Sequence, residues 1–372
     1  MPLCTLSTGD IVYRYYKCVV VSFIGARKVL STSVLNGGYH EDLTAVFNND
    51  CNPGDGLACT LKAPTYEEHL KLIAEELGLA ENSVSGISTT ADMKNLVICQ
   101  KSYERLTVTA LVTGGIEVNG GRVGDPAQYY EPKGTPHYRP GTINIILIID
   151  GNMPQGILAR ALVTCTEAKV AALQELLAGS NYSTGIATGS GTDSSIIIAN
   201  AESSLYFTSA GKHDKLGELI GVVVKKAVKE ALAKQTGLSP KQQHSMLRRM
   251  KRFGITEELI WQKYHSIDKL RGKAEVLDCL YKLDTNNDLV TPASLYVHLL
   301  DQYKWELISE VELEGGCADI RRIICQRYKV ALLGHTKVVE ATAIHKVLDL
   351  WIYLICEILH SNCFDEQQIE VV

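Results

Sequence analysis

Side chains that could perform acid–base or nucleophilic chemistry gather in three short segments near the middle of the 372-residue chain. The segments are Thr166-Glu167-Ala168-Lys169, Thr188-Gly189-Ser190-Gly191-Thr192-Asp193 and Gly211-Lys212-His213-Asp214-Lys215-Leu216-Gly217-Glu218. Hydrolysis of an amide or ester without a metal requires a nucleophile or base, a group that orients it, and donors for the oxyanion. The three segments contain every residue type that this reaction needs, although composition alone does not bring them together.

Apolar runs on either side of these segments predict the elements that position them. Residues 141–150 and 194–199 are strongly apolar and predict two buried strands. Between these strands, Pro154 begins a helix whose apolar residues recur at helical spacing. Lys169 lies at the margin of the apolar face of this helix, where a lysine either extends to solvent or is paired. Glu167 lies away from that face.

A long amphipathic helix follows the third segment. Its apolar face is formed by Leu216, Leu219, Ile220, Val223, Val224, Ala227 and Ala231. His213 lies at the start of this helix, where unpaired backbone N–H groups and the helix dipole favour an anion. Glu218 falls on the polar face, near Asp214. The same position also suits His213 as a simple helix cap without a catalytic role.

Two glycine-rich turns in the first half of the chain could bring the backbone close to a ligand. Asn36-Gly37-Gly38 ends a strand. It either forms an ordinary hairpin turn, because Asn-Gly favours positive φ, or leaves room for a ligand beside Asn36. The second turn, Gly114 to Gly124, precedes Asp125 and is free to fold tightly.

The order of the predicted elements indicates two domains. Residues 1–236 predict a mixed α/β domain, a layered sheet with flanking helices. Thr236-Gly237 and Ser239-Pro240 then end the long helix. Residues 237–372 predict a mainly α-helical domain of unassigned role. Its helices are expected near residues 241–252, 256–265, 267–283, 292–301, 319–332 and 340–360.

Composition and motif spacing argue against several classes of protein. A net charge of −5 gives no support to a nucleic-acid binder, and no apolar run is long enough to span a membrane. The eleven cysteines are scattered, which predicts reduced thiols in a cytoplasmic protein. The Gly189–Thr192 turn lacks a standard phosphate-binding motif, and no histidines have metal-ligand spacing. The segment after Asp284 lacks the glycine and glutamate of a calcium loop.

Six short sequence motifs occur in the same order as in a known protein family, and this combination is more specific than any one motif alone. They are Asn36-Gly37-Gly38, Gly124-Asp125-Pro126, Gly141-Thr142-Ile143-Asn144, Thr166-Glu167-Ala168-Lys169, Gly189-Ser190-Gly191-Thr192-Asp193 and Gly211-Lys212-His213-Asp214-Lys215-Leu216-Gly217-Glu218. Through them, residues 30–232 resemble the adenosylcobinamide amidohydrolase family of corrinoid salvage. Ser190 and Asp214 stand where the family usually has threonine. The aspartate adds a negative charge beside His213, which favours the protonated form of the imidazole.

The resemblance implies an enzyme that hydrolyses the amide joining aminopropanol to the corrin ring, giving adenosylcobyric acid. The substrate is a large corrinoid small molecule, which suits a broad cleft rimmed by glycine-rich loops. Its cobalt belongs to the substrate, so no metal or other cofactor is required of the protein. A nucleic-acid or membrane partner is not expected, and a homo-oligomer is compatible with the sequence.

A mechanistic hypothesis assigns roles to these residues. His213, held by Asp214 or Asp193, is the general base toward water or the hydroxyl of Thr188 or Thr192. The oxyanion is stabilised by backbone N–H groups of residues 189–191 or of the helix start. Lys169 and Glu167, both in the predicted catalytic set, form a buried pair that positions the helix, and the pair could instead be purely structural. The predicted substrate-binding set is Asn36, Gly37, Gly38, Asp125, Asn144, Gly189, Ser190, Gly191, Asp214, Lys215 and Glu218.

Three alternatives stay open at this point. The chain could bind corrinoids without hydrolysing them, in which case binding would occur without product. It could instead be an amidase for another bulky amide, which a substrate panel would separate. Self-cleavage before Thr113, which would create an N-terminal threonine nucleophile, is a third alternative that an intact-mass measurement would test.

Overall fold

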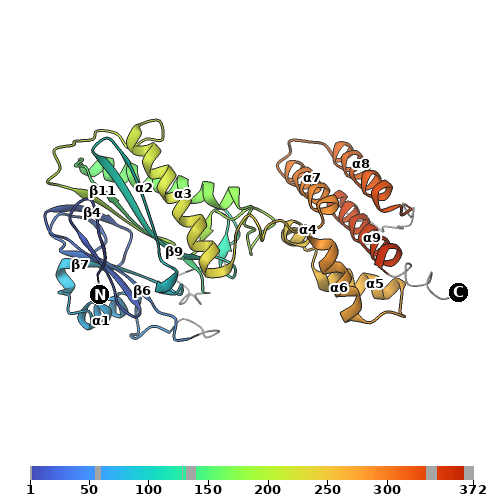
Figure 1. Cartoon of the computed structure of the whole chain (residues 1–372), viewed down its shortest axis with the longest axis horizontal. Coiled ribbons are helices and arrows are strands. Elements are labelled where there is room, and N and C mark those ends of the chain that lie inside the picture. Colours follow the sequence, from blue (N-terminus) through green and yellow to red (C-terminus); the bar gives the residue numbers. More distant parts are fainter. Residues whose placement is uncertain (1, 55–59, 128, 131–139, 332–341, 364–372) are drawn as a thin grey trace. The chain divides into compact units, whose positions relative to one another are not determined.

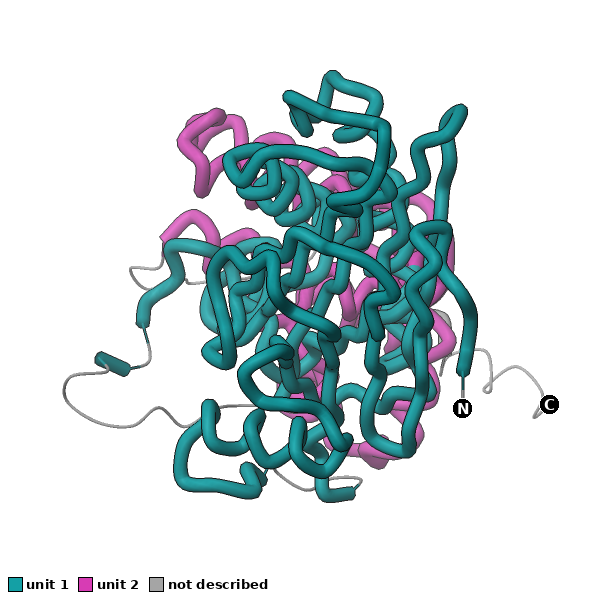
Figure 2. Tube along the Cα trace, turned by 90° about the vertical axis from the view of Figure 1, so that its left-hand side faces the viewer, with its two compact units in different colours: residues 1–239 teal, residues 240–372 magenta. Residues whose placement is uncertain are grey.

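The structure is a computed structural model that describes residues 2–54, 60–127, 129–130, 140–331 and 342–363. Its contacts divide the chain into two compact units, Met1–Ser239 and Pro240–Val372, which are coloured separately in Figure 2. The first unit contains mixed sheets with flanking helices, and the second is helical. The predicted fold class is therefore confirmed.

The first unit contains two stacked sheets and a short ribbon. The five-stranded sheet has the order β1 (Pro2–Thr5), β2 (Ile11–Arg14), β3 (Cys18–Ser22), β6 (Ala45–Asp50), β7 (Val84–Thr89). The six-stranded sheet has the order β5 (Gly38–His40), β4 (Arg27–Ser31), β13 (Ser194–Asn200), β11 (Thr142–Ile149), β9 (Leu106–Gly115), β8 (Val97–Tyr103). The ribbon pairs β10 (Gly120–Gly121) with β12 (Gly189–Ser190). Two pairs are parallel, β6 with β7 and β11 with β13.

Helices cover the outer face of each sheet, which gives four layers (Figure 1). Helix α1 (Tyr66–Glu76) packs on the five-stranded sheet through Leu70, Ile73 and Ala74. Helices α2 (Gln155–Glu175) and α3 (Lys215–Thr236) pack on the six-stranded sheet and bury its largest apolar core. A separate apolar layer lies between the two sheets.

Alternation along β11 explains why this strand is apolar on both faces. Ile143, Ile145, Leu147 and Ile149 face the helices, whereas Ile146 and Ile148 face the other sheet. This period-2 pattern places Asn144 on the inter-sheet face, near the amino end of the strand. A buried polar residue therefore lies at one end of the layer between the sheets.

The second unit consists of helices in the part of the chain that the structure describes. They are α4 (Met246–Met250), α5 (Glu257–Ile267), α6 (Lys273–Asp284), α7 (Asn287–Lys304), α8 (Glu310–Tyr328) and α9 (Ala343–Cys363). The predicted starts of two helices are wrong. Helix α7 begins at Asn287 because the Asn286 side chain caps it, and Pro292 lies inside it. Helix α8 begins at Glu310 because Ser309 and Glu312 form a capping box that the sequence analysis missed.

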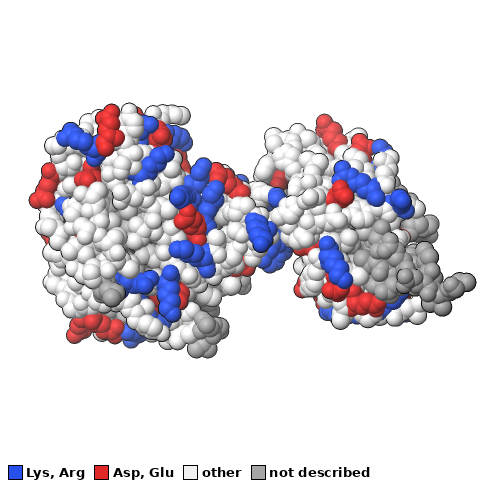
Figure 3. Space-filling model, viewed as in Figure 1, with Lys and Arg blue, Asp and Glu red and all other residues white. Residues whose placement is uncertain are grey.

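Two surface properties follow from the structure. Among the described residues, no helix combines the length and the apolar character needed to cross a membrane. Basic and acidic side chains are interspersed on the face that Figure 3 shows.

Candidate active site

Lys169 and Asp193 form an ion pair between α2 and the turn that precedes β13. Each side chain is only 12% exposed. The Asp193 carboxylate also accepts hydrogen bonds from the Ile143 backbone N–H at 2.8 Å, the Ser190 hydroxyl at 2.7 Å and the Ser190 backbone N–H at 3.1 Å. The carboxylate thus joins helix α2, strand β11 and the glycine turn.

Gly189 is required for this close approach. A Cβ atom added there would lie 2.2 Å from Asp193 Oδ2 and 2.8 Å from Lys169 Nζ. The ion pair therefore lies directly against the backbone of the turn. Thr192, at the other side of the turn, donates its hydroxyl to the Gly141 carbonyl at 3.1 Å.

The second glycine-rich turn is held against the first one by the β10–β12 ribbon. The Thr188 hydroxyl accepts a hydrogen bond from the Val123 N–H at 2.9 Å, and Thr188 N–H donates to the Gly121 carbonyl at 2.8 Å. Asp125 accepts hydrogen bonds from the Ser180 hydroxyl at 2.6 Å and the Arg122 N–H at 2.8 Å. Burial opposes ionisation of Asp125, but the hydrogen bonds outweigh it and hold its pKa below the usual value. Asp125 thus stabilises the turn.

Asn144 lies beneath the site within a buried polar network. Its amide donates to Asn48 Oδ1 and to the Ser88 carbonyl, both at 2.9 Å. Asn48 in turn donates to the Thr113 hydroxyl at 2.8 Å. Asn144 is 1% exposed and both of its amide hydrogens are used in this network, so its contact with substrate stays a prediction. Its network instead supports the strand ends below the turn.

The Asn36 segment lies at the same end of the six-stranded sheet. Thr32 N–H donates to the Ser195 carbonyl at 3.0 Å, two residues after Asp193. Asn36 has the positive φ of 45° that Asn-Gly sequences favour, but the predicted two-residue hairpin turn is not formed, because Ser31 pairs with Gly38 and residues 32–37 make the connection. Its amide donates to the carbonyls of Glu81 and Val84, both at 2.7 Å. Both amide hydrogens are therefore used inside the protein and are not available to a substrate in this conformation. The exposed Gly37 and Gly38 follow.

The third segment, with His213, lies at the opposite end of the six-stranded sheet from Asp193. Leu232 and Gln235, near the end of α3, pack against Gly114 and Gly115, which pair with Ile143 and Thr142. At the other end of α3, Lys215 lies 4.6 Å from the ring centroid of Tyr103.

Tyr103 pairs with Leu106, at the far end of β9 from Gly115. Because β9 has 10 residues, the two ends are about 30 Å apart. The structure thus does not bring His213 and Asp193 together, and the expected contact between them is wrong. Asp214 instead accepts a hydrogen bond from the Ser209 hydroxyl. His213 itself is exposed, and Lys215 pairs with Glu218.

The predicted pair between Lys169 and Glu167 is also wrong. Glu167 is exposed and pairs with Lys212 at 3.2 Å, whereas Lys169 points inward to Asp193. Residues two positions apart on a helix point in very different directions, so one partner cannot serve both. Glu167 therefore contacts the segment that carries His213, whereas Lys169 contacts the turn that carries Ser190.

A histidine–serine pair that the sequence analysis did not associate lies between α1 and β7. His69 Nε2 is 3.4 Å from the Ser88 hydroxyl, and both residues are buried. His69 Nδ1 accepts the Lys62 backbone N–H at 3.1 Å, so Nε2 carries the proton of the neutral ring. Burial, together with the nearby Lys62, holds the pKa of His69 below its usual value. In this tautomer Nε2 donates to Ser88 and does not act as a base toward it.

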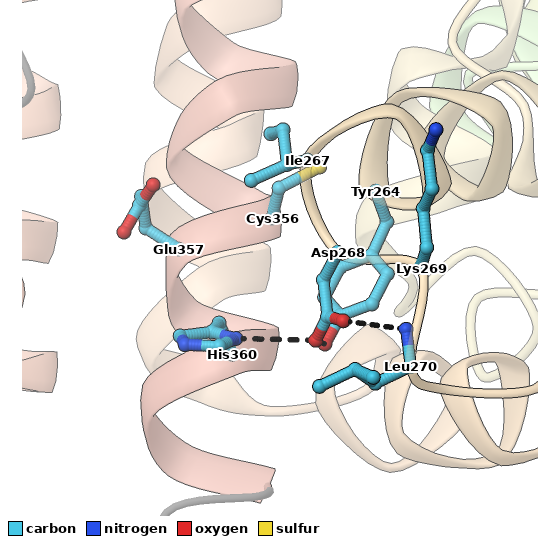
Figure 4. Close-up of a pocket in the computed structure, with 8 residues that line it drawn as sticks. All are labelled: Tyr264, Ile267, Asp268, Lys269, Leu270, Cys356, Glu357 and His360. Atoms are coloured by element: carbon cyan, nitrogen blue, oxygen red, sulfur yellow. Dashed lines mark hydrogen bonds and ion pairs between the residues drawn. The ribbon is translucent and has the colours of Figure 1, made fainter.

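Pockets that could hold a ligand lie in both units, and one of about 960 Å³ lies beside α1 in the first unit. Among the described residues, no group of three or more His, Cys, Asp or Glu side chains could hold a metal ion. A pocket of about 610 Å³ lies in the second unit, between the end of α5 and α9 (Figure 4). There Asp268 accepts the Leu270 N–H at 2.8 Å and the Tyr264 hydroxyl at 3.1 Å, and lies 3.6 Å from His360. Neither Asp193 nor any residue that contacts it lines this pocket.

Comparison with known proteins places the first unit. The adenosylcobinamide amidohydrolase family matches residues 4–240. An uncharacterized protein of Methanocaldococcus jannaschii is 33% identical over 231 residues, which covers 59% of this chain and 87% of that protein. A crystal structure of a Pyrococcus horikoshii protein shows 14% identity and a TM-score of 0.30 over 61% of this chain and 79% of that one. That likeness is too weak to support an argument.

The family match covers more than half of the chain and ends where the first compact unit ends. It includes both glycine-rich turns, the Lys169–Asp193 pair and the His213 segment. The chain belongs to the adenosylcobinamide amidohydrolase family.

Proposed function

We propose that this protein hydrolyses the amide bond between aminopropanol and the corrin ring of adenosylcobinamide, giving adenosylcobyric acid. The family membership supports the reaction class. One structural observation supports the location: the Ser190 hydroxyl donates to Asp193, whose carboxylate also pairs with Lys169, at the junction of two glycine-rich turns. A hydroxyl, a carboxylate and a cation in contact are suitable parts for amide hydrolysis.

In this proposal Ser190 is the nucleophile. Its Oγ attacks the amide carbon while Asp193 accepts the hydroxyl proton, and that proton passes to the nitrogen as the C–N bond breaks. Aminopropanol leaves as the amine, and an ester with Ser190 remains. Water then attacks the ester with Asp193 again as base, which releases adenosylcobyric acid and restores the serine hydroxyl. Lys169, which lies against the Gly189 backbone, stabilises negative charge over the turn.

The choice of Ser190 follows from its contacts. Thr192 donates its hydroxyl to a backbone carbonyl, and the Thr188 hydroxyl accepts a backbone N–H. Neither contact supplies a base, whereas Ser190 contacts a carboxylate. His213 is not included, because it lies at the other end of the sheet.

The test is incubation of the purified protein with adenosylcobinamide, followed by chromatography for adenosylcobyric acid and aminopropanol. We expect both products in equal amounts from the natural protein and almost none from Asp193→Asn. Substrate that binds without forming product would support a non-catalytic corrinoid-binding protein. Absence of both binding and product would refute the proposed substrate, and a panel of other bulky amides would then be tried.

A further inference from the structure

A group of exposed apolar side chains lies in the segment beside the candidate site. Val118 is 52% exposed, Val123 is 83% exposed and Tyr129 is 52% exposed. Single exposed apolar residues are common on protein surfaces. Several of them next to a polar site are more informative, because apolar patches often mark the place where a ligand or partner binds.

The two valines flank the ribbon whose other strand carries Ser190. Val118 precedes β10 and Val123 follows it, while Gly120 pairs with Ser190 and Gly121 pairs with Gly189. The Val123 N–H is bonded to the Thr188 hydroxyl at 2.9 Å. The backbone that carries the valines is therefore connected directly to the turn that carries the proposed nucleophile.

Neighbouring residues hold the valines in these exposed positions. Asn119, between Val118 and β10, is 6% exposed and donates to the Gly141 carbonyl at 3.1 Å. It also accepts the Tyr182 hydroxyl at 2.8 Å. Asp125 fixes the turn after Val123 through the Arg122 N–H. Exposure of the valines is thus a property of an anchored turn, and a β-branched side chain on an anchored turn loses little entropy when it binds a ligand.

We propose that Val118 and Val123 contact the apolar face of the corrin ring and determine specificity for this bulky substrate. This inference rests on the proposed function. The ring is wide and carries methyl groups around its rim, so it offers apolar area next to the amide that is cleaved. A small amide would reach Ser190 without touching either valine.

The experiment compares Val118→Asp and Val123→Asp with the control Val163→Asp, on the exposed face of α2, where the valine is 44% exposed. Initial rates give KM and kcat for adenosylcobinamide, and equilibrium titration gives the affinity for cobyric acid, which needs no turnover. We expect each site variant to raise KM and weaken cobyric acid binding at least tenfold, or about 1.4 kcal/mol. The value of kcat should stay within about twofold, and the control should match the natural protein.

The outcomes separate this inference from the proposed function. Hydrolysis by the natural protein with unchanged KM and affinity in both variants would overturn the valine contact and leave the function standing. No hydrolysis, with cobyric acid binding that the variants weaken, would overturn the function and support the contact. Unchanged affinity together with a changed sedimentation coefficient would show that a second copy covers the valines, which also overturns the inference. Circular dichroism and melting curves confirm that the variants are folded.

Discussion

Lys169 reaches from the middle of α2 to Asp193, 24 positions later in the chain, and the pair closes the turn that carries Ser190. Both side chains are largely buried, and the carboxylate accepts three further hydrogen bonds. A buried ion pair with a well-satisfied carboxylate contributes to stability only while both partners remain. The pair therefore links the stability of the turn to its chemistry.

Removal of one partner should destabilise the first unit. We expect Lys169→Met or Asp193→Asn to lower the free energy of unfolding by about 3 kcal/mol, because each leaves buried polar groups without a partner. The double variant should lose less than the sum of the two changes. Urea unfolding measures all three. The exposed pair of Glu167 and Lys212 is the control, and its removal should cost less than about 1 kcal/mol.

Ser190 should be the hydroxyl on which hydrolysis depends. We expect Ser190→Ala to lower kcat by at least about a thousandfold, since the proposed nucleophile is absent. Ser190→Thr should retain activity, because it keeps the hydroxyl. Thr192→Val removes a neighbouring hydroxyl that contacts a carbonyl, and should stay within about tenfold of the natural rate. Steady-state rates with adenosylcobinamide decide this, and an active alanine variant would point to water as the nucleophile.

A methyl group added at Gly189 should separate Lys169 from Asp193. The new Cβ would meet Asp193 Oδ2 and Lys169 Nζ, so we expect Gly189→Ala to reduce activity by at least about a hundredfold while the fold is kept. Gly221→Ala is the matched control, because nothing lies within 4 Å of its added Cβ and it is in the middle of α3. That control should raise stability by about 0.5–1 kcal/mol and leave activity unchanged.

His213 should contribute little to the chemical step at Asp193. We expect His213→Ala to change kcat/KM by less than about tenfold, or 1.4 kcal/mol, because the histidine lies at the other end of the sheet. The measurement is the initial rate at several pH values. A loss of more than a hundredfold in a folded variant would restore the histidine as general base and require a different conformation of the third segment.

Asp125 should make stability depend on acid pH. Its pKa in the folded protein is held below the value of about 3.9 that an aspartate has in an unfolded chain. Its contribution is therefore fully present above about pH 4, and is lost as the pH falls through the folded-state pKa. Melting temperatures of the natural protein and Asp125→Asn, measured from pH 3 to pH 7, should differ at neutral pH and converge at the acid end. A constant difference would show that Asp125 stabilises the turn without its charge.

The sequence predicts the elements of the first unit better than their contacts. Continuous apolar residues identify β11 and β13, and helical spacing identifies α2 and α3. Strand β8 was missed because five of its seven residues are exposed and its apolar run ends at Gln100-Lys101-Ser102. The hydrogen bonds around Asn144 were also not predicted, because the residues that form them with it, Asn48, Ser88 and Thr113, lie on three other strands.

The two contacts that were predicted wrongly, Lys169 with Glu167 and His213 with Asp193, join residues that are close in sequence and point or lie apart in the fold. Lys169 and Glu167 are two positions apart on a helix, and this spacing already argues against a pair. Asp193 precedes β13 and His213 follows it, so the chain crosses the sheet between them. Closeness in sequence was treated as closeness in space. The Lys169–Asp193 pair could not be derived in the same way, because it depends on how α2 packs on the sheet.

The place of β4 in the six-stranded sheet has a consequence for the order of folding. Strand β4 pairs with β13, and Thr32 is bonded to Ser195 across 163 positions of sequence. Closing so long a loop is slow, since the entropy is lost before the contacts are gained. The turn that contains Asp193 leads directly into β13, so we expect it to take its final form only when β13 pairs with β4. During refolding, activity should therefore return with the final cooperative phase, later than the helical signal, and partly folded chains should be inactive.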